Sequence, residues 1–214
     1  SAALKEPGAL QSSRPIARFI SERLSAVSHD GLVTLHGVTF WGHLALVLGF
    51  LTYLGYSKHL HIATSAFTVY FSSTKKRGRL TPLRIDLEGD AEPVLGAATL
   101  EDLTWKEALD LYACTECGRC QSVCPAWNTG KPLSPKLLVM DLRDHLFEQG
   151  PGIVAAKAAG TAYEKVALVP DVIDPEVIWS CTTCGACMQE CPVDIEHVDT
   201  IVDVRRNLVM AESQ

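Results

Sequence analysis

Residues 114–125 read Cys114-Thr-Glu-Cys117-Gly-Arg-Cys120-Gln-Ser-Val-Cys124-Pro125. Residues 181–192 repeat this arrangement as Cys181-Thr-Thr-Cys184-Gly-Ala-Cys187-Met-Gln-Glu-Cys191-Pro192, so the spacing C-x2-C-x2-C-x3-C-P occurs twice. Together the two runs contain all 8 cysteines of the chain. No cysteine is therefore left over for a disulfide or a free nucleophile.

This spacing is typical of ferredoxins with two 4Fe-4S clusters, in which the fourth cysteine of each run binds the other cluster. We therefore expect two clusters with crossed ligands. The first cluster would be held by Cys114, Cys117, Cys120 and Cys191. The second would be held by Cys181, Cys184, Cys187 and Cys124.

Structural zinc and disulfides are the alternatives to this interpretation. Zinc sites usually use C-x2-C pairs without an obligatory Cys-Pro. Dense disulfides are typical of small secreted scaffolds, and this chain has 214 residues. The pattern favours iron–sulfur clusters and, with them, a reducing compartment.

Composition excludes few functions but shows where the apolar residues lie. The formal net charge of -6 gives no reason to expect a nucleic-acid partner. No substrate-level acid–base pair, activated nucleophile or nucleotide-binding loop is evident in the sequence. The mean hydropathy of +0.13 is high for a chain with 21% charged residues, and residues 31–57 contain no Asp, Glu, Lys or Arg.

Residues 31–56 are long and apolar enough to cross a hydrocarbon layer of about 30 Å, which takes about 20 residues. The alternative is a core helix of a globular domain. More basic residues follow the span than precede it, which predicts that the C-terminal side is cytoplasmic. We expect an inner (cytoplasmic) membrane protein whose cluster domain lies on the cytoplasmic side.

His43 and His61 are candidate haem ligands. On one continuous helix a separation of 18 residues corresponds to five turns and about 27 Å, so both rings would share a face, one near each leaflet. Histidine is costly inside a bilayer and tends to be functional there. His36 lies near the same face and His59 points away from it. A plain polar role near the interface is the alternative for each histidine.

Residues 43–62 (HLALVLGFLTYLGYSKHLHI) resemble the last transmembrane helix of the nitrate reductase gamma-subunit family, a dihaem cytochrome b. The resemblance implies that His43 and His61 each give one axial ligand to a different haem b. It also implies that further transmembrane helices or a partner subunit complete the two haem sites.

The remaining segments flank these two features. Residues 1–30 are a polar lead-in, within which residues 15–27 have the spacing of an amphipathic helix, either packed or lying on a membrane surface. Residues 31–71 would form the membrane helix and an interfacial segment. Residues 72–103 read as a linker, with a strand possible at 83–87.

Residues 104–214 read as a helical cluster domain. A capping box at Thr104 predicts a helix to about Ala113, and Ser134-Pro135 begins another that Gly150-Pro151-Gly152 should end. Asp174-Pro175 opens a short helix, and the apolar spacing after Pro192 predicts a last one to about Met210. The expected fold is mainly α: a transmembrane helix of a cytochrome b domain, then an α-helical ferredoxin domain.

Residues 113–136 resemble the iron–sulfur subunits of heterodisulfide reductases and, more distantly, those of succinate dehydrogenase and glycolate oxidase. One branch of that group joins such a domain to a nitrate-reductase-gamma-type membrane part. This branch implies electron transfer from electron transfer flavoprotein, through clusters and b haems, to a quinone. A thiol/disulfide or 2-hydroxy acid donor and a soluble ferredoxin-type adaptor remain alternatives.

Overall fold

The structure is a computed structural model that describes residues 16, 19, 20, 23, 27–57, 59–74, 78–83 and 94–213. The chain divides into two compact units, residues 1–57 and 58–214. Residues 16, 19, 20 and 23 are helical, but most of the amphipathic segment predicted at 15–27 lies outside the described residues. Most of the strand predicted at 83–87 lies outside them as well.

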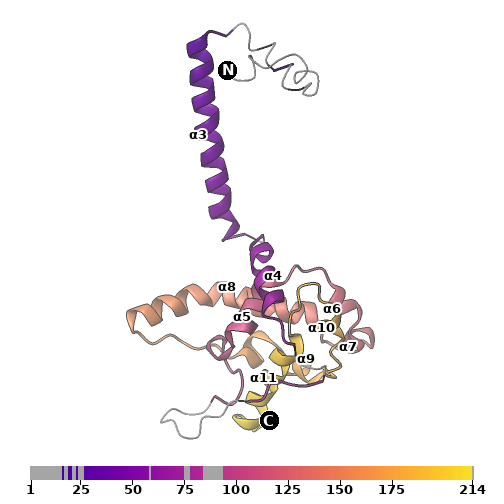
Figure 1. Cartoon of the computed structure of the whole chain (residues 1–214). Coiled ribbons are helices and arrows are strands. Elements are labelled where there is room, and N and C mark those ends of the chain that lie inside the picture. Colours follow the sequence, from indigo (N-terminus) through magenta and orange to yellow (C-terminus); the bar gives the residue numbers. More distant parts are fainter. Residues whose placement is uncertain are drawn as a thin grey trace. The chain divides into compact units, whose positions relative to one another are not determined.

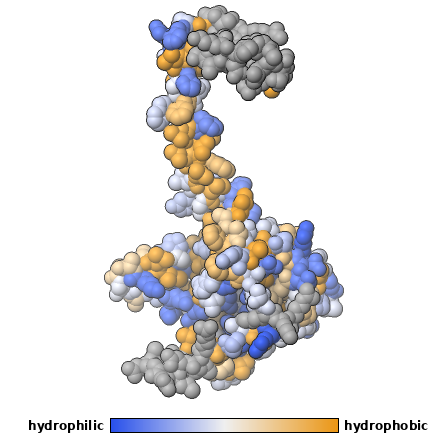
Figure 2. Space-filling view, viewed as in Figure 1, coloured by the Kyte–Doolittle hydropathy of each residue, from blue (hydrophilic) through white to orange (hydrophobic). Residues whose placement is uncertain are grey.

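The first unit contains one long helix, α3 (His29–Leu54), which is mostly apolar (Figures 1 and 2). Ser28 caps its start by accepting a hydrogen bond from the Gly31 N–H at 3.2 Å. No residue of α3 is buried. The hydroxyls of Thr34, Thr39 and Thr52 each donate to a carbonyl four residues earlier, at 2.9, 2.8 and 2.6 Å. Its polar side chains are thus satisfied within the helix, as a lipid environment requires, and within the described part of the chain only α3 has the length and composition of a membrane span.

The prediction of one helix carrying both His43 and His61 is wrong. The helix α3 ends at Leu54, and α4 (Leu60–Tyr70) begins the second unit. Gly55 caps α3, and the N–H groups of Tyr56 and Ser57 turn back to Tyr53 and Leu54 at 3.0 and 3.3 Å. The shared-face argument therefore does not apply, and α4, which the sequence grouped with the span, packs on α5 of the second unit.

The second unit is helical around one main core, and no strand occurs in its described residues. Its longer helices are α5 (Trp105–Ala113), α8 (Pro135–Ala159) and α11 (His197–Met210), as Figure 1 shows. Between them lie the short elements η2 (Leu100–Asp102), α6 (Arg119–Ser122), α7 (Pro125–Asn128), η3 (Leu168–Val172), α9 (Pro175–Trp179) and α10 (Ala186–Glu190). The main core includes Leu111, Leu138, Leu142, Leu168, Ile178, Ile201 and Leu208.

Three predicted helix starts are confirmed by their caps. Thr104 and Glu107 form the predicted capping box of α5, with the Thr104 N–H donating to the carboxylate at 2.8 Å. Ser134 accepts from the Leu137 N–H at 3.2 Å and starts α8. Asp174 accepts from the Glu176 N–H at 2.7 Å and starts α9. Each cap satisfies a backbone donor that the helix leaves free.

The predicted end of α8 at residues 150–152 is wrong, since the helix continues through Pro151 to Ala159. Tyr163, on the returning chain, packs closely against Gly152, and its hydroxyl donates to Gln149 at 2.5 Å. This tertiary contact holds the segment helical despite the proline. The helix ends at Gly160, whose positive φ of 65° and N–H bond back to Ala156 form the C-cap.

Candidate iron–sulfur centre

The two cysteine runs fold into loops with the same backbone. Two residues after the first cysteine, Glu116 and Thr183 have φ of 57° and 53°. The next turn needs glycine, because Gly118 and Gly185 have φ of 79° and 73° and begin α6 and α10. The fourth cysteines, Cys124 and Cys191, share ψ of 119°. The sequence repeat is therefore also a structural repeat.

These loops bring the cysteines together in two groups of four. One cavity is lined by three cysteines of the first run and the last of the second: Cys114, Cys117, Cys120 and Cys191. The other cavity is lined by the reciprocal set: Cys181, Cys184, Cys187 and Cys124. The structure thus gathers the sets that the spacing predicts, including the exchange of the fourth cysteine.

The donor sets fit polynuclear clusters better than single ions. Among the described residues, no group of three His, Cys, Asp or Glu side chains lies close enough to hold one metal ion. Thiolates around a 4Fe-4S cluster each bind a separate iron and so stand farther apart. Burial raises the pKa of Cys120 to about 11 and that of Cys187 to about 12. These two thiols are protonated at neutral pH without metal, so binding iron releases their protons.

An apolar cluster separates the two cavities. The helices α6 and α10 pack against each other. The third cysteine of each run, Cys120 and Cys187, is buried in a small cluster with Val198 of α11. This arrangement excludes water from the space between the two sets of ligands.

Backbone N–H groups donate to two of the sulfur atoms. The Thr183 N–H lies 3.3 Å from Cys181 Sγ, and the Ile195 N–H lies 3.4 Å from Cys191 Sγ. Hydrogen bonds of this kind stabilise the negative charge on a ligand sulfur and help to set the reduction potential of a cluster.

Sequence reasoning missed three side chains near these cavities. Lys136 and His197 line the first cavity. His197 Nδ1 lies 3.0 Å from the Ile195 carbonyl, and burial lowers its pKa to about 4, which keeps the ring neutral. Arg205 donates to the carbonyls of Ile178 and Cys181, each at 2.6 Å, and so holds the start of the second loop. Only Lys136, two residues after a predicted helix start, carried a local sequence signal.

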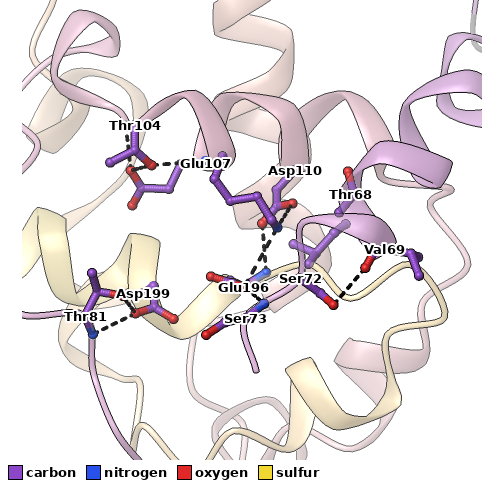
Figure 3. A network of polar contacts seen from close by, with 12 residues as sticks. Thr68, Val69, Ser72, Ser73, Thr81, Thr104, Glu107, Asp110, Glu196 and Asp199 are labelled. Carbon is purple, nitrogen blue, oxygen red and sulfur yellow. Dashed lines mark hydrogen bonds and ion pairs between the residues drawn. The ribbon is translucent and has the colours of Figure 1, made fainter. Parts of the chain in front are cut away.

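A polar network links α5, α11 and the segment after α4 beside the first cavity (Figure 3). Asp110 pairs with Lys106 at 2.5 Å and accepts from the Glu196 N–H at 3.0 Å. The Glu196 carboxylate accepts from the Ser73 N–H at 2.8 Å, and Asp199 accepts from Thr81 Oγ1 at 2.7 Å. Burial raises the pKa of Asp110 to about 6. The network fixes the chain that leads from Cys191 into α11.

The structure does not bring the two candidate haem ligands together. His43 is exposed on α3 in the first unit, and His61 is partly buried near the start of α4 in the second. Their roles stay predictions.

Comparison with known proteins supports the iron–sulfur interpretation. Residues 113–195 match the family described as 4Fe-4S dicluster domain. Over 94% of its length the chain is 39% identical to "Probable iron-sulfur-binding oxidoreductase FadF" of Bacillus subtilis, of which it covers 32%. It is 35% identical, again over 94%, to "EtfAB:quinone oxidoreductase" of Syntrophomonas wolfei, of which it covers 30%. It is 41% identical over 84% to "Probable membrane-anchored ferredoxin" of Chromohalobacter salexigens, of which it covers 29%.

The chain spans about a third of the length of these curated relatives. Heterodisulfide reductase iron–sulfur subunits also match, over about half of this chain. No solved structure matches it. The chain is therefore related to iron–sulfur oxidoreductases that transfer electrons, which confirms the coarser part of the resemblance read from residues 113–136.

Proposed function

We propose that this chain is the iron–sulfur part of a membrane-bound oxidoreductase that passes electrons from electron transfer flavoprotein to a quinone. The observation that carries the proposal is the pair of cavities, each lined by four cysteines drawn from both runs. When bound, two 4Fe-4S clusters would supply one-electron chemistry. The chain itself would supply the thiolate ligands, the N–H donors to sulfur and the apolar packing between the sites.

The choice of donor rests on how far the relatives extend along the chain. The relative named for EtfAB and quinone matches 94% of it, which includes residues of both units. The heterodisulfide reductase subunit matches 47%. The longer match favours electron transfer flavoprotein over a thiol/disulfide couple or a 2-hydroxy acid oxidase as the source of electrons.

The cluster assignment is tested by metal analysis of anaerobically purified protein. We expect about eight irons per chain from the clusters and EPR signals from two interacting reduced centres. Zinc in place of iron would contradict the assignment. The donor is tested separately, by mixing the loaded protein with reduced electron transfer flavoprotein and following cluster bleaching. Reduction by a dithiol or a hydroxy acid system, but not by the flavoprotein, would contradict the choice of donor.

Haem b is a further part of this proposal and rests on the resemblance of residues 43–62. His43 would give one axial ligand to an outer haem and His61 one to an inner haem, and helices outside this chain or a partner subunit would complete both sites. A b-type absorption spectrum is expected in the assembled complex. His43→Ala and His61→Ala should each remove one haem, whereas His59→Ala and His36→Ala should remove none. Absence of b-type absorption would contradict this part alone.

The membrane location is likewise proposed, with the second unit on the cytoplasmic side. The support is the length and composition of α3 and the relative named as a membrane-anchored ferredoxin. Recovery of the chain in the soluble fraction at high salt would favour a soluble adaptor instead.

A further inference from the structure

Helix α4 presents its polar side chains to the protein and its apolar side chains outward. Thr68 is fully buried, and the hydroxyl of Thr64 donates to the Tyr112 carbonyl on α5 at 3.1 Å. On the outer side, Ile62 is 62% exposed, Phe67 57% and Tyr70 80%. The helix contains no Asp, Glu, Lys or Arg. A helix that faces water has the opposite arrangement, with its apolar stripe turned inward.

Aromatic rings extend this outer face onto α5. The ring of Phe71 meets the ring of Tyr70 edge-on at 4.9 Å and the ring of Trp105 edge-on at 5.1 Å. Trp105, the first residue of α5, is 64% exposed. We call the face formed by Ile62, Phe67, Tyr70, Phe71 and Trp105 the α4–Trp105 surface. It is a continuous exposed apolar patch, which marks a binding surface rather than a solvated one.

The connection between the helices limits where this surface can lie. The helix α3 ends at Leu54 and α4 begins at Leu60. A chain of six residues reaches at most about 20 Å. If α3 crosses a membrane, α4 therefore stays within about 20 Å of the point where the span ends, whatever the arrangement of the two units.

The chemistry of the segment fits the headgroup layer of a bilayer. Tyrosine and tryptophan are enriched where a bilayer meets water, because their rings are apolar with one polar group. In the sequence, Lys58 precedes α4, and Lys75, Lys76 and Arg77 follow it closely. Basic residues beside an apolar segment favour a surface of anionic lipids. A protein partner offers no comparable reason for cations at both ends of the segment.

We propose that the α4–Trp105 surface lies in the headgroup layer of an anionic membrane and forms a second contact beside α3. This inference rests on the proposed membrane location. The surface holds the second unit against the bilayer at α4 and α5, so that the helix leading into the first cysteine run is itself a membrane contact.

Four tryptophans allow the two membrane contacts to be tested separately. Trp41 lies on α3, Trp105 lies on the proposed surface, and Trp127 and Trp179 lie on α7 and α9. The full chain, loaded with clusters, is reconstituted as single-tryptophan variants in vesicles of phosphatidylcholine and phosphatidylglycerol whose acyl chains are brominated near the headgroup. We expect bromine to reduce Trp105 emission by about twofold and to leave Trp127 emission unchanged.

Each other outcome has a defined meaning. Quenching of Trp41 but not Trp105, with Trp105 open to aqueous iodide, overturns the surface contact and leaves the membrane span intact. Protection of Trp105 from both quenchers indicates a protein partner and also overturns it. No quenching of Trp41 contradicts the proposed span itself.

A charge placed on the surface provides a second measurement. Phe67→Asp should reduce bromine quenching of Trp105 at least about twofold, because a carboxylate is repelled by anionic lipid and is costly to bury. Val154→Asp is the matched control, since Val154 is equally apolar and 68% exposed but lies on α8. Cluster absorbance confirms folding of both variants. Equal quenching in Phe67→Asp and Val154→Asp would overturn the proposal.

Discussion

The first and second cysteine cavities share a backbone but differ in what surrounds them. Glu116, Lys136 and His197 line the first cavity together with its four cysteines. The second is lined by Pro125, Leu133, Pro135, Val198 and Ile201 and by small neutral residues of its own loop, with no charged residue among them. The repeat thus fixes the ligands, and the single-copy helices α8 and α11 make the two environments different.

The largest expected effect tests whether the ligands are crossed. Cys124→Ser should destroy the cluster at Cys181, Cys184 and Cys187 and lower the iron content from about eight to about four per chain. The cluster at the first run should survive, as EPR of the reduced protein would show. Cys191→Ser is the reciprocal control and should destroy the first cluster only. Loss of the cluster belonging to the mutated run would mean that each run binds its own.

The next prediction concerns acid sensitivity at the first cavity. The folded-state pKa of His197, about 4, lies below its ordinary value of 6.5. Its contribution to stability is therefore complete above pH 6.5 and falls as the pH drops toward 4, by roughly 2 kcal/mol between pH 6.5 and 5. His197→Asn keeps a side-chain N–H group near the Ile195 carbonyl but does not titrate. We expect a smaller drop in the thermal midpoint between pH 7 and 5 than in the parent.

Asp110 provides the control of opposite sign. Burial raises the pKa of Asp110 to about 6, so its contribution to stability grows as the pH falls from 6 toward 4. Asp110→Asn should therefore lose more stability in acid than the parent does. A pH profile that neither substitution changes would show that these two groups do not govern acid stability.

The shared backbone itself predicts equal costs in the two loops. Gly118→Ala and Gly185→Ala place a side chain at φ of 79° and 73°, and a Cβ meets no atom within 4 Å at either site. Only the left-handed conformation is penalised, which should cost about 1 kcal/mol at each position in chemical denaturation. A clearly larger cost at one glycine would show that the loops are less alike than their dihedral angles indicate.

The smallest expected effect is a difference in reduction potential. Lys136 lines only the first cavity, and a nearby positive charge favours the reduced cluster. Lys136→Met should lower the first potential by roughly 30 mV, after allowance for solvent screening, and leave the second unchanged. Lys131→Met is the matched control, because Lys131 is exposed and lines neither cavity. Equal shifts in both potentials would remove the distinction between the cavities.

Local signals predicted much of the second unit. The cysteine spacing indicated the two groups of four, and the caps at Thr104, Ser134 and Asp174 marked three helix starts, because each depends on residues adjacent in sequence. Features that depend on distant contacts were missed. The continuation of α8 through Pro151 depends on Tyr163, and the position of Arg205 depends on the packing of α11 against α9. The end of α3 at Leu54 was missed because the apolar pattern continues unbroken through Gly55.

The exchange of the fourth cysteine has a consequence for biosynthesis. On the proposed ligation, a growing chain that has passed residue 124 carries four cysteines but three ligands of one site and one ligand of the other. Neither site is complete until the ribosome has added residues 181–191, so assembly machinery meets no finished cradle before then. Cluster insertion should therefore be a late step that delivers both clusters to a nearly complete domain, and premature termination before Cys181 should leave no cluster at all.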